Sequence, residues 1–119
     1  MSAIAVIDFE TSGLMPEAGG RATEVAIVLV EQGRVIDRFA SLMNAGVWIP
    51  PFITELTGIS NAMLQDAPSA DAVMRDAARF VGNAPMVAHN ASFDSKFWQA
   101  ELALAGLPAP QPFACTVLL

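Results

Sequence analysis

Two acidic residues, Asp8 and Glu10, stand two positions apart where a short apolar run ends. Side chains two positions apart on a strand point to the same side, so these carboxylates would lie next to each other. Neighbouring carboxylates repel unless a proton or a cation lies between them, and residues 1–20 contain no Lys or Arg. Hard divalent cations such as Mg²⁺ or Mn²⁺ favour oxygen ligands and would satisfy the pair. A strand that simply ends in an acidic loop is the alternative.

The three residues after Glu10 favour a ligand site over a plain acidic loop. Thr11 and Ser12 offer hydroxyl groups that can donate and accept hydrogen bonds. Gly13 has no side chain, so a ligand can approach its backbone closely. The segment therefore indicates a site that combines metal-binding acids with hydrogen-bonding groups.

A second cluster, residues 89–94 (His-Asn-Ala-Ser-Phe-Asp), follows the apolar segment 86–88 and opens a helix. Asp94 would lie in the first turn of this helix, where the helix dipole favours the ionised carboxylate. Stabilisation of the helix end is the alternative role of an Asp at such a position. By itself this hexapeptide is only moderately specific.

Together the two clusters are far more specific. Asp-Phe-Glu-Thr-Ser-Gly at residues 8–13, followed by His-Asn-Ala-Ser-Phe-Asp, resembles the DEDD exonucleases. The resemblance is to the branch that contains the epsilon subunit of DNA polymerase III and ribonuclease T. It covers the whole chain as one domain, residues 1–119, and includes Leu-Thr-Gly-Ile at 56–59 and Cys-Thr-Val-Leu-Leu at 115–119.

The resemblance implies a role for each matching residue. Asp8, Glu10 and Asp94 correspond to three metal-binding acids of a site for two Mg²⁺ or Mn²⁺ ions. The stretch that contacts the 3′-terminal nucleotide corresponds to Thr11, Ser12, Gly13 and Leu14, with Leu14 against the base. Asn90 and Phe93 match positions that shape the same groove, and Thr57 matches a position near the terminal base. Burial alone would favour plain core roles for Leu14 and Phe93.

One family motif is missing from the 119 residues. The family has a His followed five residues later by an Asp, downstream of the element that matches Cys115 and Thr116. That His is the general base, and that Asp completes one metal site. His89 and Asp94 share this spacing, but their context is that of the second motif, so His89 is not assigned as the base. We therefore expect an exonuclease domain that is incomplete at its C-terminal end, has one deficient metal position, and is weak or inactive as this chain.

The order of elements predicts an α/β fold, and the resemblance implies a ribonuclease H-like mixed sheet flanked by helices. We expect the missing final helices to leave one side of the sheet bare, which would favour self-association. Strands are expected at 3–9, 22–31, 34–43, 85–88 and 112–115, with a hairpin at 32–33 and a loop at 10–20. One or two short helices are expected within 52–65. Longer helices are expected from the N-cap Ser69 to residue 81 and at 91–105, and another begins at 116.

Composition limits the function classes. Hydrophobic residues make up 54% and charged residues 15%, which excludes disorder. Six basic against twelve acidic residues, a net charge of −6, argue against a general nucleic-acid binder unless metal ions hold the phosphates. No apolar run approaches the ~18 residues of a membrane span, and no signal peptide is recognisable. The single Cys115 fits a reducing, cytoplasmic compartment.

Three functions remain open at this point. The first is a 3′→5′ exonuclease domain acting on single-stranded DNA or RNA 3′ ends, with a DNA polymerase subunit as a possible partner. The second is a non-catalytic module that binds nucleic acid or a polymerase through the same scaffold. The third is a metal-binding protein of unrelated function.

Overall fold

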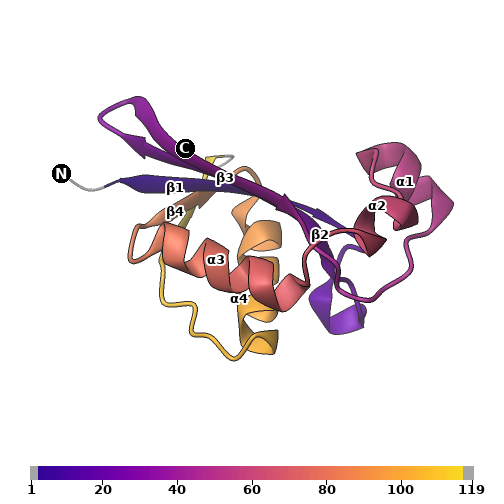
Figure 1. Ribbon diagram of the computed structural model, residues 1–119. Coiled ribbons are helices and arrows are strands. Elements are labelled where there is room, and N and C mark those ends of the chain that lie inside the picture. Colours follow the sequence, from indigo (N-terminus) through magenta and orange to yellow (C-terminus); the bar gives the residue numbers. More distant parts are fainter. Residues whose placement is uncertain (1–2, 117–119) are drawn as a thin grey trace.

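A five-stranded mixed sheet forms the centre of the computed structural model, which describes residues 3–116 (Figure 1). The strand order is β3-β2-β1-β4-β5. The first three strands are antiparallel neighbours, whereas β4 runs parallel to β1 and β5 parallel to β4. The strands are β1 (Ile4–Thr11), β2 (Ala22–Glu31), β3 (Arg34–Leu42), β4 (Met86–Ala88) and β5 (Phe113–Cys115).

Two long helices cover one face of this sheet, and two short ones stand apart from it (Figure 1). The covering helices are α3 (Ala70–Val81) and α4 (Ala91–Leu104). The short helices, α1 (Pro51–Thr57) and α2 (Asn61–Gln65), enclose a small core of their own made of Ile49, Ile59 and Leu64. A 3₁₀ turn, η1 (Pro16–Ala18), lies in the loop between β1 and β2. No helix within residues 3–116 is long and apolar enough to cross a membrane.

The α/β class and the order of elements predicted from the sequence are confirmed. Ser69 caps α3 by accepting a hydrogen bond from the Ala72 N–H, as the sequence predicts. Two local predictions are wrong: β1 continues through Glu10 to Thr11, and the following loop contains η1. The extension of β1 arises because Glu10 still pairs with Glu24 of β2. The helix expected from residue 116 falls mostly on residues outside the described range.

Alternation along β1 shows which side of the sheet carries the core. Ala5, Ile7 and Phe9 are buried against α3 and α4, whereas Ile4 and Val6 remain 41% and 39% exposed. Successive strand residues point to opposite faces, so the second set lies on the face without helices. Of the residues in 3–116, no helix covers that open face (Figure 1). The open face is therefore apolar and unprotected at its centre.

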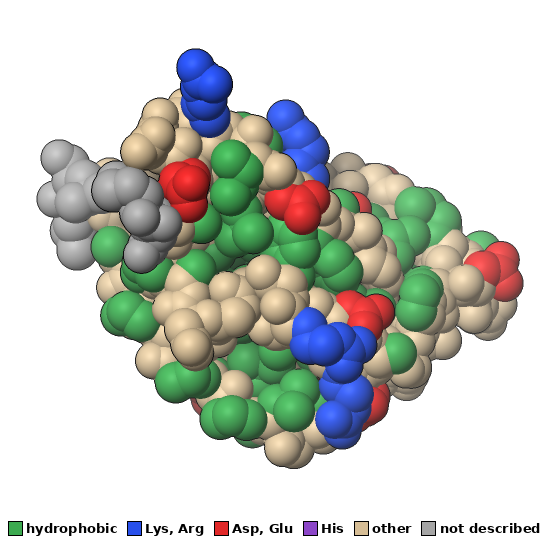
Figure 2. All heavy atoms as spheres, turned by 60° about the vertical axis from the view of Figure 1, so that its left-hand side comes forward, with side chains coloured by type: hydrophobic (Ala, Val, Ile, Leu, Met, Phe, Trp, Pro, Cys, Tyr) green, Lys and Arg blue, Asp and Glu red, His purple; other side chains and the backbone are tan. Residues whose placement is uncertain are grey.

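Basic side chains are few and widely separated on the surface. In the view of Figure 2, hydrophobic side chains reach the surface in many places, whereas Lys and Arg side chains stand at a few separate points. Two of the five arginines, Arg75 and Arg79, are paired with acids on their own helix, Asp71 and Asp76. On this face no continuous basic surface exists to which a nucleic-acid backbone could bind.

The two faces of β1 should differ sharply in their contribution to stability. Ile7→Ala should lower the free energy of unfolding by about 2–5 kcal/mol, because it opens a cavity beneath α3 and α4. Val6→Ala, one residue away on the open face, should cost less than about 1 kcal/mol. Urea denaturation of both variants would measure this difference. An equally large loss for Val6→Ala would show that a second copy covers the open face in solution, and sedimentation would then detect a dimer.

Candidate active site

Asp8 and Glu10 lie on the open face at the end of β1. The strand alternation that buries Ile7 and Phe9 on the helix side sends both acids to the other side. Their partners across β2 are Ala26 and Glu24. Two acids of β1 and one of β2 therefore share one end of this face.

Asp94 reaches the same place from the opposite direction. It lies in the first turn of α4, is only 3% exposed, and its Oδ1 accepts a hydrogen bond from the Phe9 N–H at 3.1 Å. The three-residue strand β4 ends at Ala88 and pairs with β1 only at Ala5 and Val6, so it does not reach Phe9. A buried backbone N–H requires an acceptor, and Asp94 supplies it. This bond fixes the Asp94 carboxylate at the Asp8–Phe9 peptide, between the positions of Asp8 and Glu10 on β1.

The pKa values of Asp94 and Glu10 show that both carboxyls are affected by neighbouring acids. The pKa of Asp94 is raised to about 6, first by burial and then by the charges of Asp8 and Glu10, while the Phe9 N–H partly offsets the rise. Burial, Asp8 and Glu24, in that order, raise the pKa of Glu10. The backbone at the start of α4 lowers the pKa of Asp94, in the direction expected for a first-turn acid, but burial and like charges outweigh it.

No basic side chain neutralises these acids. The nearest in sequence, Arg21, is bound to Glu101 and contributes no ion pair to Asp8, Glu10 or Asp94. Within residues 3–116, no three His, Cys, Asp or Glu side chains are already arranged as a metal-holding group. The donor set nevertheless fits a hard divalent cation, because it consists of carboxylate oxygens that repel one another and lack any other counter-charge. Asp8 is exposed and free to turn toward such an ion.

The hydroxyls of the loop after β1 are used by the loop itself. Thr11 donates to the Gly13 carbonyl at 2.7 Å, and the Ser12 Oγ accepts from the Arg21 N–H at 2.9 Å. A ligand would therefore meet a loop whose shape these bonds already fix. Leu14 is 81% exposed, so a core role for Leu14 is ruled out.

Two glycines of this loop differ in whether the fold leaves room for a side chain. A Cβ at Gly20 would lie 2.8 Å from the Met15 carbonyl oxygen, so the fold itself requires glycine there. A Cβ at Gly13 would meet only the Gly20 Cα, at an ordinary 3.6 Å. The fold does not require glycine at Gly13, and the missing side chain leaves its backbone open to close approach.

The other three residues expected in the groove have different surroundings. Phe93 is half-buried, with its ring centroid 5.0 Å from that of Phe97. Asn90 precedes α4 in a left-handed conformation (φ 60°) that Asn tolerates better than most residues. Thr57 ends α1, and its hydroxyl donates to the Ile53 carbonyl and accepts from the Ile59 N–H. The Thr57 hydroxyl is thus engaged within its own segment.

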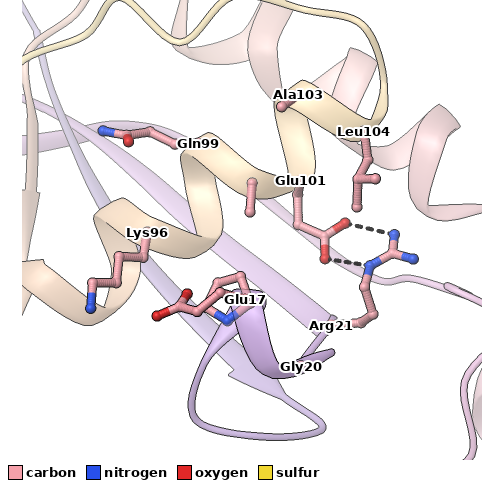
Figure 3. Close-up of a pocket in the computed structure, with 10 residues that line it drawn as sticks. Glu17, Gly20, Arg21, Lys96, Gln99, Glu101, Ala103 and Leu104 are labelled. Carbon is pink, nitrogen blue, oxygen red and sulfur yellow. Dashed lines mark hydrogen bonds and ion pairs between the residues drawn. The ribbon is translucent and has the colours of Figure 1, made fainter.

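Sequence reasoning missed two acids that shape the site. Glu24 stands directly across from Glu10, and only the register of β1 and β2 reveals this pairing. Glu101 is 2% exposed and holds Arg21 through two 2.9 Å contacts, while it also accepts from the Ala22 N–H (Figure 3). Its position seven residues after Asp94, on the same side of α4, was the available signal.

Comparison with known proteins gives this arrangement a family. The sequence profile of the RNase T exonuclease family matches residues 5–119. The chain belongs to that family. It is an exonuclease domain with a ribonuclease H-like fold, as the sequence resemblance implied.

Several proteins share the domain. The 3′-5′ exonuclease DinG of Bacillus subtilis (strain 168) is 39% identical over 113 residues, which are 95% of this chain and 12% of that protein. A DNA polymerase III subunit epsilon-like protein of Rhodobacter capsulatus is 38% identical over 116 residues, 96% of this chain and 16% of that protein. The chain thus spans less than a fifth of the length of these two relatives.

Solved structures agree with the fold. Exonuclease X, solved in complex with 5′ overhanging duplex DNA, has a TM-score of 0.74 at 31% identity, over 95% of this chain and 59% of that one. Exonuclease I in its complex with SSB-Ct has a TM-score of 0.84 over 97% of this chain and 28% of that one. At 15% identity the second likeness supports the fold alone.

The two loop glycines provide a matched test. Gly20→Ala should destabilise the domain, because its Cβ collides with backbone at Met15. Gly13→Ala should leave thermal unfolding unchanged but weaken metal-dependent nucleotide binding at least several-fold. Circular dichroism melting and calorimetric titration with a mononucleotide would separate the two effects. Unchanged binding by Gly13→Ala would remove Gly13 from the site.

Asp94 should destabilise the metal-free fold at neutral pH. Its folded pKa of about 6 lies above the ordinary 3.8, so its contribution to stability is greatest in acid and is lost as the pH rises through about 6. Asp94→Asn keeps an oxygen that can accept from Phe9 but carries no charge. It should raise the melting temperature by a few degrees near pH ~7.5 and by nothing below pH ~4. Mn²⁺ should raise the melting temperature of the original chain but not of Asp94→Asn.

Proposed function

We propose that this domain hydrolyses the phosphodiester bond at the 3′ end of a single strand of DNA. The observation that carries the proposal is the hydrogen bond from Phe9 to Asp94, which holds a third carboxylate against the Asp8–Glu10 pair. The named relatives, an exonuclease and a DNA polymerase III epsilon-like protein, favour the polarity and the reaction. The structure of exonuclease X with duplex DNA favours DNA over RNA.

Asp8, Glu10 and Asp94 would hold Mg²⁺ or Mn²⁺ in a two-metal arrangement. Such ions, when bound, activate the attacking water and stabilise charge on the phosphate and the leaving oxygen. The protein's own part is to orient three carboxylates in one place. Asp94 is oriented by the Phe9 N–H, and its high pKa falls when a cation replaces the proton.

The loop and the start of α4 would bind the terminal nucleotide. Leu14 is exposed, so it is available to a base, and Phe93 offers part of an aromatic ring. The Thr11, Ser12 and Gly13 backbone would approach the sugar and phosphate. We keep Asn90 and Thr57 as contacts to the same nucleotide on the family resemblance alone.

Proton transfer is the step for which this chain is least equipped. Its only histidine, His89, follows β4, and its Nδ1 lies 3.0 Å from the Thr116 hydroxyl. This bond ties His89 to the end of β5, and we assign it a positioning role there rather than that of general base. The His and Asp of the family's third motif are not among the 119 residues.

Wider properties form part of the same proposal. A DNA polymerase subunit is the favoured protein partner, because relatives carry the name DNA polymerase III. A cytoplasmic location is favoured by the single cysteine. A non-catalytic module that binds a 3′ end is the second candidate, because the only histidine of the 119 residues is engaged with the Thr116 hydroxyl.

Metal binding tests the carboxylates. Asp8→Ala should abolish Mn²⁺ binding in calorimetric titration, because the two remaining acids cannot hold the ion. Asp37→Ala, which removes an exposed acid at the far strand β3, should bind Mn²⁺ like the original chain. Undiminished binding by Asp8→Ala would contradict the assignment of Asp8.

Turnover tests the missing base. This chain should release mononucleotides from 5′-labelled single-stranded DNA at a rate near background, because loss of a general base alone removes ~10²–10⁴-fold of rate. A version extended by the downstream gene sequence should be active if that sequence supplies the third motif. Rates of ~1 s⁻¹ or more from the 119 residues would contradict this prediction. His89→Ala would then show whether His89 or a second copy supplies the base.

A further inference from the structure

A pocket of about 620 Å³ lies between η1 and the side of α4 that faces it (Figure 3). Part of its lining is apolar, with Pro16 on one wall and Ala100, Ala103 and the 65% exposed Leu104 on the other. Lys96 and Glu17 extend from opposite walls at one end (Figure 3). The pocket thus combines an apolar lining with one cation and one anion.

Lys96 is the cation of this pocket whose charge is available. It is the only lysine of the sequence, it is exposed, and it makes no hydrogen bond or ion pair within residues 3–116. Arg21 also lines the pocket, but two of its nitrogens donate to Glu101 at 2.9 Å and the third donates to the Ala45 carbonyl at 3.4 Å. An incoming anion would therefore be attracted by Lys96 and opposed by Glu17.

Residues that line the pocket lie close in sequence, on both walls, to those proposed to hold the terminal base. On α4, Phe93, Lys96 and Ala100 are spaced by three and four residues, so they form one stripe along the helix. On the other wall, Leu14 stands two residues before Pro16. From Phe93 to Ala103 the helix rises about 15 Å. A strand whose last base lies between Leu14 and Phe93 would enter the pocket with its next nucleotides.

We infer that this pocket is a second strand-binding subsite, which takes the nucleotide on the 5′ side of the terminal one and binds its phosphate through Lys96. The inference rests on the proposed function. The base and sugar would lie on the apolar lining, which does not distinguish one base from another. The Lys96 ammonium group would bind the phosphate of the strand backbone. Glu17 would weaken the subsite by repelling the same phosphate.

Binding of single-stranded oligothymidylate, measured by fluorescence anisotropy with a 5′ label and Ca²⁺ in place of Mg²⁺, tests the subsite. Lys96→Ala should lower the affinity about 3–10-fold and reduce the slope of log affinity against log salt by about 0.7, the value for one phosphate contact on a single strand. Glu17→Gln should raise the affinity. Arg34→Ala, which removes an exposed, unpaired cation from the β2–β3 hairpin, should change neither quantity. Thymidine monophosphate should bind all four proteins equally.

The outcomes separate the subsite from the exonuclease proposal. Unchanged affinity and salt slope in Lys96→Ala, or an equal loss for oligonucleotide and mononucleotide, would overturn the subsite. Failure of the original chain to bind the oligonucleotide would also overturn it. If Asp8→Ala leaves mononucleotide binding intact while Lys96→Ala still weakens oligonucleotide binding, the subsite stands and the metal-dependent site falls.

Discussion

The hydrogen bond from the Phe9 backbone to Asp94 is the interaction on which the site depends. It exists because β4 stops at Ala88, which leaves the next part of β1 without a strand partner on that side. Asp94, in the first turn of α4, accepts the hydrogen bond that a longer β4 would have accepted. One carboxylate therefore positions the end of β1 and the start of α4 relative to each other. Without that bond, the motif on β1 and the motif on α4 would be two unrelated acidic segments.

The buried pair of Arg21 and Glu101 explains why the acids stay uncompensated. A cation one loop away from Asp8 and Glu10 would ordinarily be drawn to them. Glu101 holds its guanidinium with two hydrogen bonds and also accepts from the Ala22 N–H, which fixes the chain as it enters β2. The free energy lost when such a pair leaves water offsets much of the attraction between its charges. The pair therefore contributes chiefly to the geometry of the site and little to stability. Keeping Arg21 away leaves the negative charge of the site uncompensated, as the proposed metal binding requires.

Local patterns were sufficient to predict most of the fold, because the strands, helices and caps are encoded over short stretches. The turn at residues 32–33 and the N-cap at Ser69 are examples whose signals lie within a few residues. Pairing across strands is not encoded in this way, so Glu24 could not be placed beside Glu10 until the register was known. The net rise in the pKa of Asp94 could not be predicted for the same reason. Its helix position is a local property, whereas its burial and its acidic neighbours come from segments about 85 residues away.

The scarcity of positive charge constrains how an acidic chain can bind a polyanion. A protein that neutralises 6–10 phosphates loses about 10³–10⁵ in affinity over a modest rise in salt. Here Arg75 and Arg79 are paired on α3 and Arg21 is paired with Glu101, which leaves Lys96 near the site. Attraction must therefore be concentrated at the metal ions and a very short stretch of backbone. Under the proposed function, such a domain would bind the end of a strand more readily than the length of one.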